Sequence, residues 1–159
     1  PLEMHHTHWR LPNDLSNIAL PYKKNARPYP GHYTFPDYPN GQLRTTTNDL
    51  ANLLIMMMQN GKFKNNQVMK KSSIEKIKLG LHWFYETFDG VKLLGHDGEE
   101  QGVVAVMFYD PINNIGAIIL SNKDGSDLTR KNGILSKMIK AAFALPSLRA
   151  KRSNPCDPL

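Results

Sequence analysis

The sequence contains one cysteine, Cys156, among its 159 residues. A single cysteine cannot form a disulfide within the chain, and it excludes a metal site built on several thiolates. No apolar run approaches the roughly 18 to 20 residues of a membrane span; the longest apolar helical stretch, Leu53 to Met58, is bounded by Asn60-Gly61. We therefore expect no transmembrane segment.

Other absences exclude fewer classes of function or location. Basic residues outnumber acidic ones by 20 to 14, but they are scattered, and no stripe of them alternates with aromatic side chains, so we expect no nucleic-acid partner. A signal peptide and an initiator methionine are missing: the sequence opens on Pro1, as a fragment or processed product would. The lack of disulfides fits the cytoplasm and the bacterial periplasm equally. Apolar residues at 40% and charged residues at 21% are ordinary for one globular domain or a large piece of one.

The first half of the chain predicts a covering loop followed by a helix. Residues 1–46 are interrupted by prolines, glycines and aromatic residues, which is typical of an ordered loop. Thr46 and Asp49 form the Thr-x-x-Asp start of a capping arrangement. Apolar residues then recur at helical spacing until the Asn60-Gly61 stop. A shorter second helix is expected from about residue 66 to Lys78.

The second half predicts strands and a closing helix. Residues 80–88 read as a strand, Asp89-Gly90 as a hairpin turn, and 91–94 as its partner. The runs 102–109 and 115–121 form a further hairpin, and an amphipathic helix is expected over 126–144. The fold class is therefore α+β, an antiparallel sheet with packed helices. We assign residues 1–146 to the domain and 147–159, where the periodicity ends, to a disordered tail.

Several short motifs resemble one known family, in their order as well as their residues. They are Pro1-Leu2-Glu3-Met4 with Thr7-His8-Trp9, then Pro39-Asn40-Gly41-Gln42-Leu43-Arg44-Thr45-Thr46, Gly95-His96-Asp97-Gly98, Phe108-Tyr109-Asp110-Pro111 and Leu120-Ser121-Asn122. Over residues 1–145 this order is similar to the latter part of the serine β-lactamase-related family, which includes class C β-lactamases, penicillin-binding proteins, D-alanyl-D-alanine peptidases and esterases. The resemblance implies part of a β-lactamase/transpeptidase-like fold, no cofactor, and a periplasmic or secreted location.

The resemblance also assigns candidate site residues. The family uses a serine in Ser-x-x-Lys, a Tyr-x-Asn or Ser-x-Asn element, and a strand carrying Lys/His-x-Gly. His96 and Gly98 match the third element, so His96 is expected to bind substrate or support proton transfer at the start of a central strand. The N–H of Glu99 would help to form the oxyanion hole. Asp97 occupies a position where family members often have Gly, Thr or Ser. We expect it to lie beside the substrate, where its charge would repel an anionic substrate.

The first two catalytic elements have only chance counterparts here. Ser73-Ile74-Glu75-Lys76 and Tyr38-Pro39-Asn40 match formally, but they occur in reversed order and inside other elements. Our main hypothesis is therefore the C-terminal part of a serine hydrolase, acting on a small-molecule amide or ester in the intact parent, inactive alone, and partnered by the missing N-terminal part of its domain. The alternative is a non-catalytic binding module or pseudoenzyme that recognises a peptidoglycan fragment or a protein through the region of His96. A remnant without function is also compatible.

Two further patterns carry no site in our interpretation. The histidines at 5, 6 and 8 lack a cysteine partner or a convergent carboxylate, so we predict no metal site. Glu99 and Glu100 are consecutive strand residues, which point to opposite faces and cannot act as an acid/base pair.

Overall fold

The computed structural model describes residues 1–125 and 133–144. Its elements, in chain order, are α1 (Thr47–Met58), β1 (Lys62–Phe63), β2 (Asn66–Gln67), α2 (Lys71–Lys76), the π-helical turn η1 (Ile77–Leu81), β3 (Phe84–Phe88), β4 (Val91–Glu100), β5 (Val103–Asp110), β6 (Ile115–Ser121) and α3 (Ile134–Phe143).

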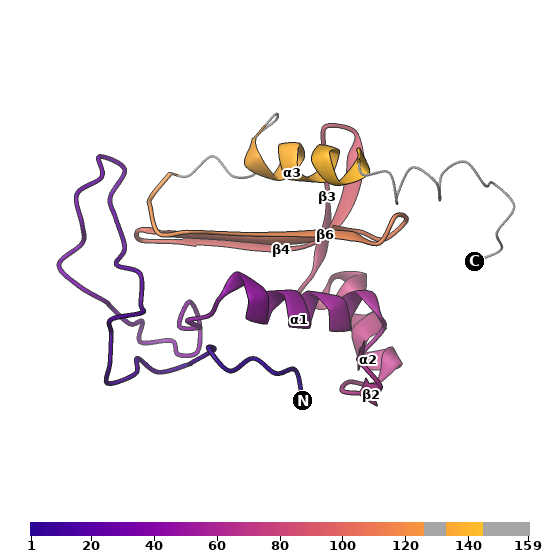
Figure 1. Ribbon diagram of the computed structural model, residues 1–159, viewed down its shortest axis with the longest axis horizontal. Helices are drawn as coiled ribbons and strands as arrows, with labels where there is room; N and C mark the ends of the chain where they lie inside the picture. The colour runs from indigo at the N-terminus through magenta and orange to yellow at the C-terminus, as the bar shows by residue number, and fades with distance from the viewer. Residues whose placement is uncertain (126–132, 145–159) are drawn as a thin grey trace, which may run out of the picture.

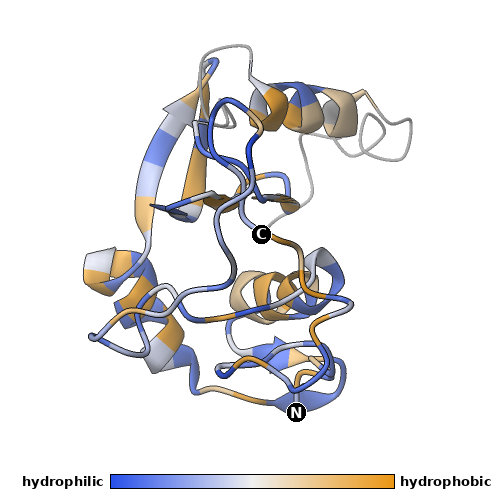
Figure 2. Ribbon diagram, turned by 90° about the vertical axis from the view of Figure 1, so that its left-hand side faces the viewer, coloured by the Kyte–Doolittle hydropathy of each residue, from blue (hydrophilic) through white to orange (hydrophobic). Residues whose placement is uncertain are grey.

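The centre of the fold is a four-stranded antiparallel sheet in the order β3-β4-β5-β6. Each strand pairs with its neighbour in the sequence through a short turn. Helix α3 covers one face and α1 covers the other, so the sheet is the middle of three layers (Figure 1). The ribbon coloured by hydropathy shows apolar and hydrophilic residues interleaved along both helices, as expected for helices with one buried side (Figure 2).

Alternation along the strands builds a separate core on each face. Leu93, Val106 and Phe108 point toward α3, where they pack with Leu135 and Ile139. On the other face, α1 packs over a second set, which consists of Leu54, Met56, Met57, Phe63, Ile74, Trp83, Leu94 and Tyr109. The two cores fix which face of the sheet each residue of β4 occupies, because neighbouring strand residues alternate.

The loop of residues 1–46 is fastened to one end of the sheet (Figure 1). The N–H of Tyr22 donates to the carbonyl of Asn122 at 2.8 Å, and the hydroxyl of Tyr33 donates to the carbonyl of Gln101. These bonds place the loop beside the β4–β5 turn. The expectation of an ordered covering loop agrees with this arrangement.

The helix after the loop forms as its cap predicts. The Thr46 side chain accepts a 3.2 Å hydrogen bond from the N–H of Asp49, and Gly61, at φ +91°, follows the last turn. The expected α+β class is confirmed, as are the hairpins at Asp89-Gly90 and between β5 and β6.

Three expected boundaries were wrong. A hairpin, β1–β2, occupies residues 62–67 where the second helix was to begin, and that helix runs only from Lys71 before continuing as η1. The strand expected at 80–88 begins at Phe84. Strand β4 extends through the polar residues 95–100 instead of ending at Leu94. The last helix begins at Ile134 within the described residues; positions 126–132 and the tail at 147–159 lie outside them.

In the part of the chain that the structure describes, no helix is long and apolar enough to cross a membrane.

Candidate active site

His96 lies within β4, an interior strand of the sheet, rather than at the strand's start. Its register partner on β5 is Met107, which packs at the margin of the α1-side core, so His96 occupies the α1 face. The side chain is exposed. Its ring centroid lies 5.8 Å from that of Phe84 on β3. The imidazole therefore leans toward the β3 side of β4.

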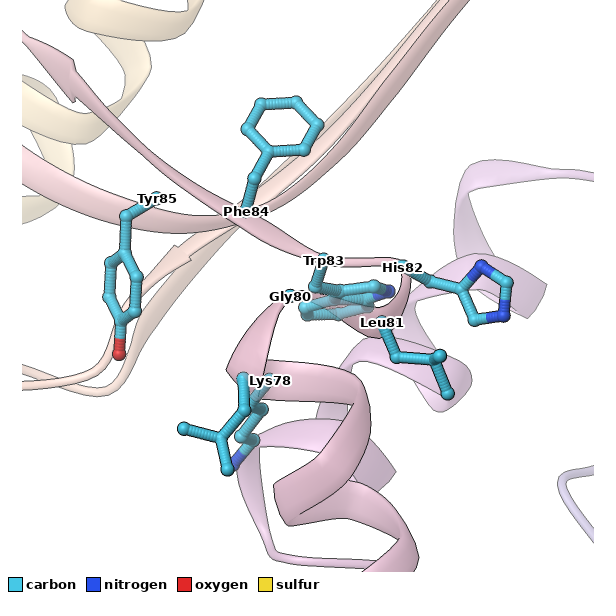
Figure 3. Close-up of a pocket in the computed structure, with 8 residues that line it drawn as sticks. Lys78, Gly80, Leu81, His82, Trp83, Phe84 and Tyr85 are labelled. Carbon is cyan, nitrogen blue, oxygen red and sulfur yellow. The ribbon is translucent and has the colours of Figure 1, made fainter.

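Strand β3 covers only part of the neighbouring edge of β4. The last register pair joins Phe84 to Gly95, and the chain before Phe84 leaves the sheet through Trp83 toward η1 (Figure 3). Residues 96–100 therefore pair with β5 on one side and with no described strand on the other. An unpaired edge presents backbone N–H and C=O groups to whatever approaches it.

The two flanking hairpins determine which backbone groups point to this open edge. Two-residue turns join Phe88 to Val91 and Glu100 to Val103, and the residues flanking such a turn form a hydrogen-bonded pair. In an antiparallel ladder, bonding alternates from one residue to the next. Both turns give the same result: the backbone N–H and C=O groups of His96, Gly98 and Glu100 form hydrogen bonds with β5. The backbone groups of Asp97 and Glu99 consequently point to the open edge, including the Glu99 N–H.

The two glycines that flank His96 have different reasons to be glycine. A Cβ on Gly95 would lie 2.1 Å from the carbonyl oxygen of Met107 and 2.7 Å from the Cα of Phe108, so packing within the sheet requires glycine there. A Cβ on Gly98 would meet nothing within 4 Å. Open space therefore adjoins Gly98, on the same face as His96.

Alternation separates the acidic residues of β4. Asp97 and Glu99 pair with Val106 and Val104, which belong to the α3-side core. Their side chains therefore point away from the His96 face, and the Asp97 carboxylate does not face the imidazole. Only Glu100 shares the face of His96 and Gly98. Its Cγ lies 3.5 Å from the position of a Cβ on Gly41, which places the loop of residues 35–46 beside this end of the strand.

A cavity of about 480 Å³ lies beside the start of β3. Residues 78–85 line it, with Lys78 and the rings of Trp83 and Tyr85 among them (Figure 3). Burial lowers the pKa of Lys78, whose Nζ donates to Asn60 Oδ1 at 3.0 Å and stands 5.7 Å from the ring centroid of Tyr109. Burial also raises the pKa of Tyr109 to about 12, with a smaller contribution from Tyr85.

The two chance motifs are not brought together with His96. Ser73 and Lys76 lie on α2, a helix of six residues whose buried member is Ile74. Among the described residues, no hydrogen bond or ion pair joins either of them to His96. Tyr38 is exposed in the loop, where its ring meets that of Trp9 edge-on.

The histidine-rich segment near the N-terminus is bound to the start of α1 through hydrogen bonds to Asp49. The N–H of His6 and the hydroxyl of Thr7 both donate to Oδ2 of Asp49, at 2.8 and 2.7 Å. These bonds lower the pKa of Asp49, that from Thr7 contributing most. Over residues 1–125 and 133–144, no group of three or more histidine, cysteine, aspartate or glutamate side chains is placed to hold a metal ion.

Sequence reasoning did not identify Phe84 or the cavity beside β3, and it did not assign an open edge to residues 96–100 of β4. The aromatic run Trp83-Phe84-Tyr85 was a usable signal, because three consecutive large rings cannot all be buried in a short edge strand. No comparable signal predicts that β4 extends beyond β3, since the polar residues 95–100 do not resemble a strand.

Comparison with known proteins supports one family. The family model described as Beta-lactamase matches residues 1–137. The structure is similar to that of the octameric penicillin-binding protein homologue from Pyrococcus abyssi, with a TM-score of 0.65 and 20% identity. That match covers 95% of this chain and 38% of the archaeal chain, so this chain spans well under half the length of that relative. No curated protein matches the chain.

Proposed function

This chain belongs to the beta-lactamase family, and from that premise we propose that it supplies the sheet side of a serine hydrolase active site. In the intact protein, the reaction would be hydrolysis of an amide or ester through an acyl-enzyme. We propose further that the nucleophile is not among these residues and that the chain alone is inactive. The observation that carries the proposal is the open edge of β4 beside His96.

The edge offers what the sheet side of such a site needs. An N–H aimed at the developing oxyanion stabilises the tetrahedral intermediate, and the Glu99 N–H points to the side of β4 that no described strand occupies. His96 leans to the same side. The space at Gly98 leaves room for a substrate to lie along the strand. His96 would bind the substrate or support proton transfer, and the serine N–H would be the second oxyanion donor.

The acidic residues near the site bear on the substrate class. Glu100 is the carboxylate on the His96 face, so it would disfavour a substrate with a carboxylate at that end of the strand. Asp97 lies on the other face. We propose an uncharged amide or ester as a better substrate than a carboxylate-bearing β-lactam.

The first test uses the chain as it stands. A chromogenic β-lactam and a p-nitrophenyl ester should not be hydrolysed above a buffer control. If turnover is seen, Ser73→Ala and its neighbour Ser72→Ala separate the cases. Loss of activity in Ser73→Ala alone would overturn the proposal by making Ser73 the nucleophile.

The second test concerns the reading frame that precedes the codon for Pro1. In-frame Ser-x-x-Lys and Tyr-x-Asn elements are expected, and a protein carrying them should hydrolyse the ester. His96→Ala in that protein should lower kcat/KM by about 10²-fold, while Asp97→Asn, on the opposite face, should change it little. An independent start with no such motifs would favour a non-catalytic binding module instead.

A further inference from the structure

A second cavity, of about 310 Å³, lies between two parts of the N-terminal loop. Reciprocal backbone hydrogen bonds between His8 and Arg44, at 2.8 and 2.9 Å, hold the two segments together. The side chains of Trp9, Arg10, Tyr38 and Arg44 are among those that line the cavity. Its size is at the lower end of the range for small-molecule sites, and it shares no residue with the β4 edge or with the cavity beside β3.

Among the residues that the structure describes, two arginines and no acidic residue line this second cavity. Arg44 donates from Nη1 to the carbonyl and Oε1 oxygens of Gln42, at 2.6 and 3.1 Å, and from Nη2 to the carbonyl of Tyr33 at 2.8 Å. All three acceptors are neutral. Within the described residues, neither Arg44 nor Arg10 forms an ion pair, and no aspartate or glutamate lines the cavity. The three bonds hold the Arg44 fork in place and leave part of its donor set unused.

The wall of the second cavity combines exposed rings with a buried amide. Trp9 and Tyr38 are 47% and 56% exposed, and their ring centroids lie 6.2 Å apart at an interplanar angle of 73°, so they form a corner. Gln42 is only 3% exposed, and its Nε2 has no hydrogen-bond acceptor among the described residues. A buried donor without an acceptor is destabilising, so an acceptor that reached it would be stabilising.

We propose that the second cavity binds a small organic anion, a carboxylate carried on a flat apolar body. The carboxylate would pair with the guanidinium groups of Arg10 and Arg44, with its position fixed by Arg44. The flat body would lie in the corner between Trp9 and Tyr38. Two guanidinium groups select the charge, and the rings select the shape. This site does not depend on the proposed hydrolase activity.

The test is an NMR titration of the full chain with benzoate, in parallel with benzyl alcohol and inorganic phosphate. The chain has two tryptophans; the second, Trp83, is mostly buried and lines the cavity beside β3, so its indole N–H reports separately on any binding there. We expect benzoate to shift the Trp9 indole and Arg44 Nε–H resonances saturably, while Trp83 stays in place. Benzyl alcohol and phosphate should each shift them much less.

Two variants make the result specific. Arg10 is exposed and holds no described contact, so Arg10→Gln should weaken benzoate binding by about threefold without unfolding the loop. Arg27→Gln removes the same charge from an exposed position outside the cavity and should leave the affinity unchanged. No saturable shift with benzoate, an equal response to benzyl alcohol, or equal affinities in wild type and Arg10→Gln would each overturn the proposal.

Discussion

The hydroxyl of Tyr29 donates a 2.7 Å hydrogen bond to Oδ2 of Asp124, 95 residues further along the chain. The other oxygen of the same carboxylate accepts the N–H of Gly102. One side chain therefore joins the N-terminal loop, the β4–β5 turn and the segment that follows β6. The hydrogen bond from Tyr29 is the main cause of a lowered pKa at Asp124, followed by that from Gly102.

This arrangement predicts a stability that is lost in acid. Because the folded-state pKa of Asp124 is depressed, its contribution is present above the ordinary value of 3.8 and disappears as the pH falls through the lower folded value. Asp124→Asn should lower the urea midpoint at pH 6, and the difference from wild type should narrow at pH 3. Asp37→Asn, an exposed carboxylate of the same loop, is the control. An equal difference at both pH values would contradict the prediction.

His96→Ala should leave the folded chain almost as stable as before. The imidazole is exposed, and its one described contact is the ring of Phe84. We expect the free energy of unfolding to change by about 0.5 kcal/mol or less in urea titrations. Phe108→Ala, in the α3-side core, should cost about 3 to 5 kcal/mol and calibrates the assay. A large loss in His96→Ala would mean that the histidine is a packing residue, which would weaken the case for a substrate role.

Local signals in the sequence were sufficient to predict the elements that begin at a helix cap or a tight turn. Thr46 and Asp49 set the start of α1, and the Asp89-Gly90 turn set the β3–β4 register. Both are determined within a few residues, because a cap or a two-residue turn needs no distant partner. Strands β5 and β6 could be predicted from their continuous apolar composition, which is also a local signal.

The errors arose where distant pairing overrode local preference. The local pattern predicts a helix from about residue 66, but Asn66 belongs to the β1–β2 hairpin, whose turn has Lys64 at φ +53°. Residues 95–100 are polar and glycine-rich, yet β5 draws them into a strand through pairs that reach Glu100. The open edge of β4 depends on where β3 stops, and no short pattern in either strand encodes that difference.

Tyr109 should make the fold sensitive to alkali. It is 2% exposed, and burial, with a smaller contribution from Tyr85, raises its pKa from 10.0 to about 12. A raised folded-state pKa means that stability is fully present below pH 10 and is lost as the pH rises toward 12. Relative to Tyr109→Phe, wild type should lose roughly 2 kcal/mol of unfolding free energy between these values. Parallel pH dependences in the two proteins, measured by urea titration, would contradict this assignment.

The glycines on either side of His96 provide a matched pair of substitutions. In Gly95→Ala, the new methyl group would lie 2.1 Å from the Met107 carbonyl oxygen and 2.7 Å from the Phe108 Cα. The backbone of β5 would have to move, and overpacking of this kind costs about 1 to 3 kcal/mol or more. In Gly98→Ala, the methyl group enters open space, and the change in stability should stay within about 0.5 kcal/mol.

The same pair separates packing from function. In urea titrations of the chain, the free energy of unfolding of Gly95→Ala should be well below that of Gly98→Ala and of wild type. In a protein that also carries the nucleophile, the order of activity loss per folded molecule should reverse, because the Gly98 methyl group would occupy the space proposed for substrate. Equal stabilities of the two variants would mean that β5 adapts to the added methyl group. Full activity in Gly98→Ala would place the substrate elsewhere than along this face of β4.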